Sequence, residues 1–261
     1  MIPKKIHYCW FGGNPLPPLA QKCIASWKKH CPDYEIIRWD ESNFDISACP
    51  LYVRQAYESR KWPFVTDYVR LKVVHDYGGI YMDTDVELLK SMDELLQHGA
   101  FFGFEDGKFI ATGLGFGAEK GSAILKELMA EYDEIAFVLA DGQLDKTPCP
   151  KRNTAVFVDR GLIQNNTKQI LAGDILILPK EYLCPMDYFS GKKTRTRNTV
   201  SIHWFAESWK TEQEKQIIRE IRKQKKMSWK IMNCCLTRLK LYGKKLIGPE
   251  AYERIKAFLK R

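Results

Sequence analysis

The first forty residues carry two kinds of apolar pattern in turn. Residues 5–10 and 34–39 are rich in β-branched and aromatic side chains, which is typical of strands. The residues between them are apolar at the spacing of a helix, at Leu19, Cys23, Ile24 and Trp27. Pro17-Pro18 favours a helix start there, and Cys31-Pro32 favours its end. This order of strand, helix and strand predicts the opening of a parallel sheet.

The clearest helical pattern spans residues 64–77. Pro63 stands at its start, and Gly78-Gly79 favours its end. The apolar residues 80–82 follow directly and predict a strand that ends at Asp83. Other apolar segments predict four more strands and one more helix, at 101–105, 114–118, 175–178 and 200–203, and at 124–132. We therefore expect an α/β fold with a mainly parallel central sheet.

Composition agrees with a folded domain plus an appendage. The chain has 261 residues, of which 45% are hydrophobic and 12% aromatic, enough to build a substantial core. The longest apolar runs, such as 175–178, are far shorter than the roughly 20 residues of a membrane span. No apolar region follows the basic residues at the start, so we expect a cytoplasmic protein without a secretory signal. The eight cysteines include no C-x-x-C pair and are expected to be reduced.

Positive charge is concentrated at the C-terminal end. Residues 210–261 contain sixteen Lys or Arg against five Asp or Glu, whereas residues 1–209 are close to neutral. This predicts a domain boundary after residue 209, with 210–261 forming a basic helical appendage. The appendage has apolar positions at helical spacing, so it is expected either to rest on an anionic membrane surface or to pack on the domain. It lacks the motifs of nucleic-acid-binding modules, so no nucleic-acid partner is expected.

Asp83 and Asp85 are the strongest chemical signal. Two residues apart in extended chain, their side chains share one face and can approach one divalent cation, which in turn can bridge the phosphates of a nucleotide-sugar. For an isolated pair the alternative would be a solvated acidic turn. Asp67 and Arg70 lie three apart on the preceding helix and can point towards this turn, where Arg70 could hold a phosphate or a sugar hydroxyl. Their alternative is a surface ion pair.

These residues carry a resemblance to a known family. Asp67-x-x-Arg70, followed by Tyr-Gly-Gly-Ile-Tyr-Met-Asp-Thr-Asp at 77–85, resembles the DXD region of glycosyltransferase family 32, and more distantly the glucosyltransferase domains of large clostridial toxins. Residues 6–13 are similar to the family's opening strand, and 203–209 to its closing motif, so the resemblance covers about residues 1–209. Many relatives have an asparagine or a Thr-Gly-Pro sequence in the middle of the chain; the nearest stretch here is 150–154, without an assigned alignment, and the acceptor contacts are left unassigned.

The resemblance implies a GT-A type nucleotide-sugar-binding domain at 1–209 and a Mn²⁺ or Mg²⁺ cofactor. The implied metal ligands are Asp83, Asp85 and His203, and the implied catalytic residues are Asp83, Asp85 and Trp209. The implied donor-binding residues are Cys9, Trp10, Asp67, Arg70, Tyr81, Asp83, Ser208 and Trp209. An indole such as Trp10 can stack on a nucleobase, and an imidazole suits Mn²⁺, but Trp10 and His203 could equally be packed core residues.

The function that the resemblance implies is retaining transfer of a hexose or N-acetylhexosamine from a nucleotide-sugar, expected to be a UDP-sugar, although guanine donors also occur in the family. No nucleophile for a covalent sugar intermediate is evident, so the expected mechanism is front-face displacement assisted by the leaving phosphate. The expected acceptor is a surface glycan, such as capsular polysaccharide or lipopolysaccharide, in free or lipid-linked form. The expected location is cytoplasmic, with peripheral contact to the inner face of the cell membrane. A metal-dependent nucleotidyltransferase is the alternative.

Overall fold

The computed structural model describes residues 1–188, 190–206, 213, 216–217 and 219–223. The chain forms two compact units, residues 1–187 with 193–209 and residues 188–192 with 210–261. The second unit lies mostly outside the described residues, and with it most of the predicted helical appendage. No described helix has the length and apolar character needed to span a bilayer.

The first unit is built around a sheet of seven strands in the order β2-β1-β3-β6-β5-β8-β7. The strands are β1 (Lys5–Cys9), β2 (Glu35–Trp39), β3 (Gly79–Tyr81), β5 (Ala100–Gly103), β6 (Phe116–Ala118), β7 (Gln169–Leu171) and β8 (Ile175–Leu178). Strands β1, β2 and β3 pair in parallel, β6 is antiparallel to β3 and β5, β8 is parallel to β5, and β7 is antiparallel to β8. Five of the seven strands thus run in one direction, and the predicted mainly parallel sheet is confirmed.

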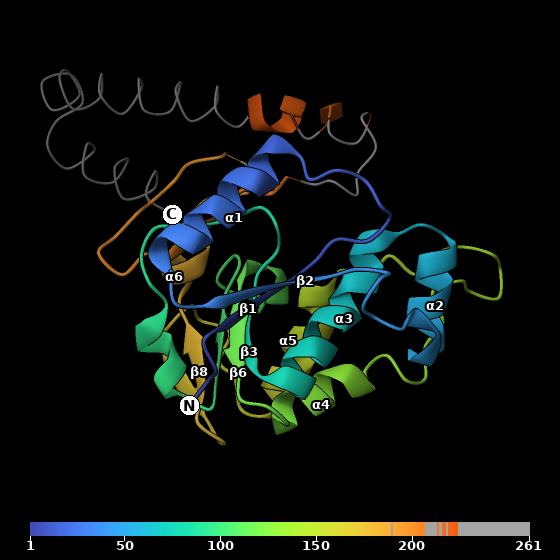
Figure 1. The fold of residues 1–261 in the computed structure, drawn as a ribbon, viewed down its shortest axis with the longest axis horizontal. Helices are drawn as coiled ribbons and strands as arrows, with labels where there is room; N and C mark the ends of the chain where they lie inside the picture. Colours follow the sequence, from blue (N-terminus) through green and yellow to red (C-terminus); the bar gives the residue numbers. More distant parts are fainter. Residues whose placement is uncertain (189, 207–212, 214–215, 218, 224–261) are drawn as a thin grey trace, which may run out of the picture. The chain divides into compact units, whose positions relative to one another are not determined.

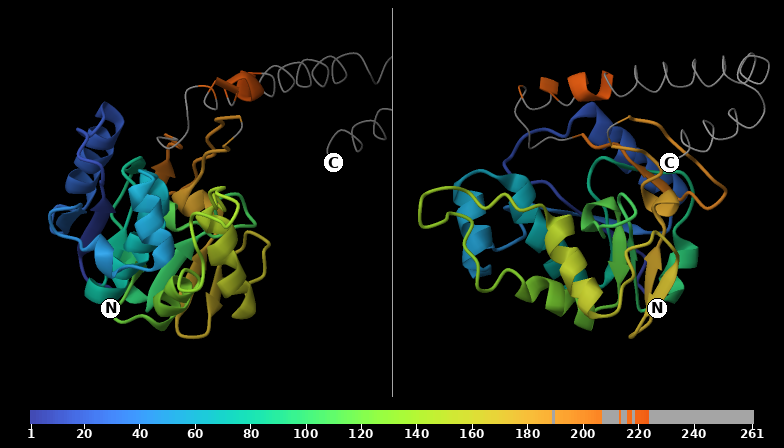
Figure 2. Two further views of the ribbon diagram at one scale, coloured as in Figure 1. Left: turned by 90° about the vertical axis from the view of Figure 1, so that its right-hand side faces the viewer. Right: turned by 180° about the vertical axis from the view of Figure 1, so that it is seen from behind.

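Helices cover both faces of this sheet (Figures 1 and 2). They are α1 (Pro18–His30), α2 (Leu51–Glu58), α3 (Trp62–Tyr77), α4 (Ala123–Ala130), α5 (Cys149–Asp159) and α6 (Lys180–Leu183), with 3₁₀ turns at Ile46–Ala48, Asp93–Gln97 and Thr112–Leu114. One core packs α2, α3, α4 and α5 against one face of the sheet, and a second packs α1 and α6 against the other. The alternation of β1 explains this division, since Ile6 and Tyr8 enter the second core and Cys9 the first.

Most predicted elements are found within two residues of their predicted ends. The pattern missed α2 and α5, which lie in long connections between strands, and the short elements β7 and α6. It also missed the two-stranded sheet of β4 (Val86–Leu88) and β9 (Ser201–His203), although β9 itself was predicted as a strand. Both strands have three residues, and pairing between segments so far apart in the chain leaves no local signal.

The turn from α3 into β3 requires its two glycines. Gly78 and Gly79 both have positive φ, and a Cβ on Gly79 would lie 2.9 Å from the carbonyl oxygen of Lys5. Buried His7 holds this turn, because one ring nitrogen lies 2.8 Å from the Gly78 carbonyl while the other accepts the Trp39 indole N–H at 3.1 Å. Burial lowers the pKa of His7, so the ring is neutral. This turn fixes where the chain enters β3, and it therefore also fixes where the residues after β3 begin.

Candidate functional site

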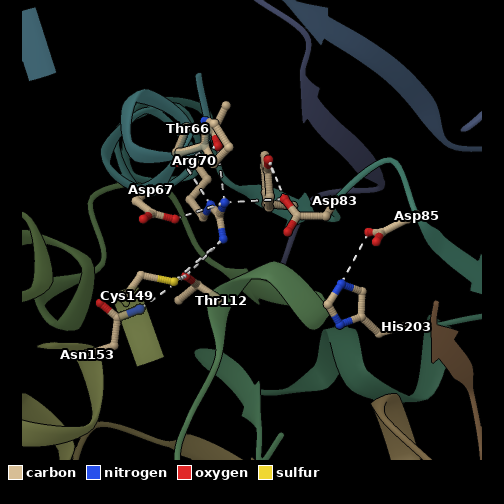
Figure 3. Close-up of polar contacts among 11 residues, drawn as sticks. Thr66, Asp67, Arg70, Asp83, Asp85, Thr112, Cys149, Asn153 and His203 are labelled. Atoms are coloured by element: carbon tan, nitrogen blue, oxygen red, sulfur yellow. Dashed lines mark hydrogen bonds and ion pairs between the residues drawn. The ribbon is translucent and has the colours of Figure 1, made fainter. Parts of the chain in front are cut away.

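Asp83 and Asp85 lie in the loop that leaves β3 at the carboxyl end of the parallel strands. In open α/β sheets this edge is where ligands gather. The backbone N–H of Asp83 donates to the carbonyl of Gly113 (3.2 Å), and the N–H of Val86 donates to the carbonyl of Asp83 (3.0 Å). The loop is therefore tied to the segment before β6 and closes as a turn before β4. Figure 3 shows the Asp83 carboxylate turned towards Arg70 and the Asp85 carboxylate turned towards His203.

Asp83 is part of a buried ionic cluster built on α3. The Arg70 guanidinium Nη2 lies 3.1 Å from Asp67 Oδ1 and 3.3 Å from Asp83 Oδ1, and its side chain is 4% exposed. The Tyr81 hydroxyl donates to Asp83 Oδ1 at 2.9 Å, and Arg70 lies over the Tyr81 ring, 5.0 Å from its centroid. The alternative of a surface ion pair between Asp67 and Arg70 is wrong, because both side chains are buried beside the Asp83 turn.

The charges in this cluster compensate one another. Burial alone would lower the pKa of Arg70, but Asp83, Tyr81 and Asp67 raise it well above its usual value. Burial raises the pKa of Asp83 and of Asp67, and the Arg70 charge opposes both shifts. Arg70 therefore remains a cation and gives two buried carboxylates the partner that they need.

The opposite wall of this cluster comes from the segment 112–114 and from α5. Arg70 Nη1 lies 3.5 Å from Thr112 Oγ1 and 4.0 Å from Cys149 Sγ, and the Asn153 amide nitrogen donates to Thr112 Oγ1 at 3.0 Å. Gly113 allows the close approach, because a Cβ there would lie 2.3 Å from Asp83 Oδ2 and 3.1 Å from Arg70 Nη1. No motif indicated Thr112, Gly113 or Cys149, because their contacts to Arg70 on α3 join positions more than forty residues apart.

Asp85 faces a different partner, His203 on β9. Pairing of β9 with β4 brings His203 opposite Val86, and His203 Nε2 lies 3.2 Å from Asp85 Oδ1. The backbone N–H of Ala206 donates to Asp85 Oδ2 at 2.7 Å, and the N–H of Trp204 donates to the Asp85 carbonyl at 3.0 Å. Burial would raise the pKa of Asp85, but His203 and the Ala206 N–H hold it below its usual value. The imidazole is thus a functional partner of Asp85 as well as a packed side chain.

The three predicted metal ligands meet at one place. Asp83, Asp85 and His203 each offer a ligand atom, and these atoms lie within 4.8 Å of one another. Two carboxylates and one imidazole are donors that suit Mn²⁺ and, for the carboxylates, Mg²⁺. Asp83 Oδ1 is engaged by Arg70 and Tyr81, whereas no described donor bonds to Asp83 Oδ2. The donor set therefore fits a divalent cation held by one oxygen of Asp83 together with Asp85 and His203.

Several buried polar atoms beside this site lack a hydrogen-bond partner. Among the described residues they are Tyr132 Oη, Arg152 Nε, Asn153 Oδ1 and His203 Nδ1. The first three lie on or next to α4 and α5, and Arg152 lies over the Tyr132 ring, 5.9 Å from its centroid. Burial raises the pKa of Tyr132, and the nearby Asp67 charge raises it further. Unsatisfied polar groups are costly in a core, so these atoms require hydrogen-bond partners that the described residues do not supply.

Other predicted residues lie near the site in different settings. The Cys9 thiol is buried, and burial raises its pKa, so it is a protonated thiol close to Tyr81 and Asp83. Trp10 is half-buried at the end of β1, packs against the second core and donates from Nε1 to the Asn14 carbonyl at 2.6 Å. Ser208 and Trp209 lie outside the described residues, so their predicted roles stay predictions.

Glu105 is a further carboxylate that the motif did not indicate. It follows β5 at the same edge of the sheet as the Asp83 loop. Burial raises the pKa of Glu105, and the charges of His203 and Asp83 act on it as well. A carboxyl group so placed adds negative charge to the surroundings of the three candidate ligands.

Comparison with known families supports the reading of the Asp83 loop. Residues 17–102 match the family described as "Glycosyltransferase sugar-binding region containing DXD motif". The match includes α3, the double glycine and both aspartates of the loop. The resemblance that the sequence indicated is thereby confirmed.

Two proteins of Schizosaccharomyces pombe are similar to this chain. Inositol phosphoceramide mannosyltransferase 3 is 32% identical over 144 residues, 52% of this chain and 38% of its own length. Inositol phosphoceramide mannosyltransferase 1 is 28% identical over 128 residues, 42% of this chain and 39% of its own length. The matches thus span well under half the length of either relative.

Two solved structures are also similar in part. The PaToxG glycosyltransferase has a TM-score of 0.46 and 17% identity, over 60% of this chain and 68% of that one. A glycosyltransferase involved in glycosylation of the major capsid of PBCV-1 has a TM-score of 0.42 and 12% identity, over 83% of this chain and 98% of that one.

Proposed function

We propose that this chain is a metal-dependent retaining glycosyltransferase with a GT-A type catalytic domain at residues 1–209. It transfers a hexose or N-acetylhexosamine from a nucleotide-sugar to a glycan acceptor. The observation that carries the proposal is the convergence of Asp83, Asp85 and His203 within 4.8 Å, next to a buried wall with unsatisfied polar atoms. A cation site and hydrogen-bonding groups beside it are two features that binding of a nucleotide-sugar requires.

Each residue of the site is proposed to bind a different part of the donor. Asp85, His203 and Asp83 would hold Mn²⁺ or Mg²⁺, which when bound neutralises the diphosphate and the charge that develops as the sugar leaves. Arg70 orients Asp83 and Asp67, so that Asp67 can accept hydrogen bonds from sugar hydroxyls. Asn153 Oδ1 can accept another. Trp10 provides an aromatic surface for the base, and Ser208 and Trp209 are proposed to contact the diphosphate and the leaving oxygen.

We also propose the class of sugar, nucleotide and acceptor that the enzyme uses. The two yeast relatives are named as mannosyltransferases of inositol phosphoceramide, which supports a hexose as the transferred sugar and a lipid-linked acceptor. The family resemblance favours a uridine donor, with a guanine donor as the alternative. Synthesis of a capsular polysaccharide or lipopolysaccharide is the proposed purpose. The proposed location is cytoplasmic, at the inner face of the cell membrane, with 210–261 as one contact to anionic lipid.

A thermal-shift measurement tests the proposal. The full chain is mixed with UDP- and GDP-sugars, each with and without Mn²⁺, and the series is repeated on Asp85→Asn and on the control Asp93→Asn, an exposed carboxylate beside Lys4. A donor near a hundredfold excess over its Kd should raise Tm by roughly 5–10 °C, since such binding stabilises by about 2.7 kcal/mol. The shift should need Mn²⁺, persist in Asp93→Asn and vanish in Asp85→Asn. Equal shifts in both variants would contradict the proposal.

Product analysis separates the proposal from the alternative of a nucleotidyltransferase. With a donor labelled in the sugar and the nucleotide, a glycosyltransferase releases the nucleoside diphosphate and transfers the sugar to the acceptor or to water. A nucleotidyltransferase breaks the diphosphate and releases a sugar phosphate. Sugar phosphate as the main product would establish the alternative.

A further inference from the structure

A strongly basic loop lies next to the candidate metal site and is not used by it. Residues 193–197 read Lys-Thr-Arg-Thr-Arg and are all exposed. Lys22 of α1 and Lys90, after β4, extend the same surface, as the contacts below show. We call Lys22, Lys90, Lys193, Arg195 and Arg197 the basic face. In Figure 1 the loop is part of the orange segment that follows α6.

The basic face is joined directly to the site through Trp204. This residue follows His203, and its backbone N–H donates to the Asp85 carbonyl. Lys193 Nζ lies 3.9 Å from the centroid of the Trp204 ring, and Lys22 Nζ lies 5.2 Å from it. Glu87 accepts the Trp204 indole N–H at 2.9 Å and lies 3.1 Å from Lys22 Nζ. The cations of the face are therefore held close to the residues that would bind the donor.

Four of the five charges of this face have no carboxylate partner among the described residues. Glu87 is engaged by Lys22 and Trp204, and Glu181 by the Asn198 amide at 2.7 Å. In the described part of the chain, Lys90, Lys193, Arg195 and Arg197 form no ion pair; the Lys90 ammonium donates to the Arg197 carbonyl at 3.1 Å. Like charges held together without a counter-charge raise the local potential and attract an anionic partner.

The loop is held in place by its own backbone hydrogen bonds. The N–H of Thr194 donates to the Pro185 carbonyl at 2.9 Å, and the N–H of Thr196 donates to Thr199 Oγ1 at 2.9 Å. The N–H of Asn198 donates to Thr196 Oγ1 at 3.1 Å. Because these N–H groups are engaged, they are not free to bind one phosphate ion together. What it presents is a spread of long cationic side chains.

We propose that the basic face docks the catalytic domain on an anionic lipid surface, through the phosphodiester headgroups of the bilayer. Spread, uncompensated cations suit a surface of many negative charges better than one small anion. A nucleic acid is disfavoured, because the lysines that lie over the Trp204 ring compete with a base for stacking on it, and Glu87 takes its N–H. The inference rests on the proposed function for its purpose, which is to hold the donor site close to a lipid-linked acceptor.

The test is co-sedimentation of the full chain with vesicles of phosphatidylcholine alone or mixed with phosphatidylglycerol. The variant Lys193→Gln, Arg195→Gln, Arg197→Gln is compared with the control Lys120→Gln, Lys126→Gln, Lys151→Gln. The control residues are exposed, lie before or on α4 and α5, and form no ion pair with described residues. Both variants lose three positive charges and keep residues 210–261, so net charge and the contribution of that segment are matched.

The wild type and the control should bind anionic vesicles in a salt-sensitive manner, and the loop variant should bind about a hundredfold more weakly. Equal binding of the two variants, or no preference of the wild type for anionic vesicles, would overturn the proposal. So would retention on RNA without vesicle binding, or release from vesicles by inorganic phosphate beyond the effect of chloride at equal ionic strength. Tm values confirm that both variants fold.

Donor hydrolysis without vesicles distinguishes this inference from the proposed function. The loop variant should hydrolyse the donor as the wild type does, because none of its three substitutions lies in the donor site. Loss of vesicle binding together with wild-type hydrolysis supports both proposals. Loss of vesicle binding in a chain that never hydrolyses any donor would support the docking surface and refute the glycosyltransferase.

Discussion

The two aspartates of one short loop lie in different electrostatic environments. Asp83 is bound by Arg70, a permanent cation, and by the Tyr81 hydroxyl, inside a cluster that α3 and the segment 112–114 enclose. Asp85 is bound by His203 and by a backbone N–H; burial would lower the pKa of His203, but the Asp85 charge raises it well above its usual value. A carboxylate paired with arginine contributes to the folded structure. A carboxylate paired with histidine has a partner that can itself become a metal ligand.

This difference divides the site into a structural half around Arg70 and a ligand-binding half around His203. The Arg70 half should respond to substitution mainly through stability, and the His203 half mainly through ligand binding. Substitutions in each half test this difference.

Arg70→Met should have the largest effect on folding. It leaves buried Asp67 and partly buried Asp83 without their cation, and loss of one partner of a buried ion pair costs about 3–5 kcal/mol. The control Arg38→Met removes a half-exposed pair with Asp40 and should cost under about 1 kcal/mol. Urea unfolding gives both values. If the two costs are similar, the Arg70 cluster is not the structural half of the site.

Gly113→Ala should be next in size. Its methyl group would lie 2.3 Å from Asp83 Oδ2, so Asp83 must move, and such overpacking costs about 1–3 kcal/mol. The donor-dependent thermal shift should fall as well. Gly99→Ala is the control, because its methyl group would meet the Gly173 carbonyl at 3.1 Å, away from the site. An unchanged thermal shift in Gly113→Ala would show that the position of Asp83 is not critical.

Sequence motifs predicted some residues of the site and missed others. The motif at 67–85 identified Asp67, Arg70, Asp83 and Asp85, because one helix and one strand carry them in a fixed order. His203 was found through a second motif more than a hundred residues away. Thr112, Gly113 and Asn153 could not be found, since a 3₁₀ turn and a helix missed by the pattern carry them. The core strands were predicted well because buried strands leave continuous apolar runs.

Asn153→Ala should affect the donor more than the fold. Its amide oxygen has no partner among the described residues, so removal of the side chain costs the hydrogen bond to Thr112, about 1 kcal/mol, and the packing of one small buried side chain. Loss of one hydroxyl contact should weaken donor binding roughly tenfold. Calorimetric titration with a donor and Mn²⁺ measures this, with Asn43→Ala in an exposed turn as control. Unchanged affinity of the donor would show that Asn153 does not contact the sugar.

Glu105→Gln should have the smallest effect, a slight rise in Tm at neutral pH. Burial raises the pKa of Glu105 in the folded chain, so the charged form destabilises the fold above its ordinary pKa. The gain should disappear as the pH falls towards about 4, where the carboxyl is protonated in the unfolded chain too. Melting curves across this range test the sign. A loss of stability at neutral pH would show that Glu105 has a stabilising partner.

The central claim is that Asp85 and His203, with Asp83, form a site for one divalent cation. The most direct test is the electron paramagnetic resonance signal of free Mn²⁺ during titration of the chain with a nucleoside diphosphate present. We predict that the wild type and Asp93→Asn each remove about one Mn²⁺ per chain, and that Asp85→Asn and His203→Ala at the same concentrations do not. Manganese binding that is equally tight in all four proteins would contradict the account.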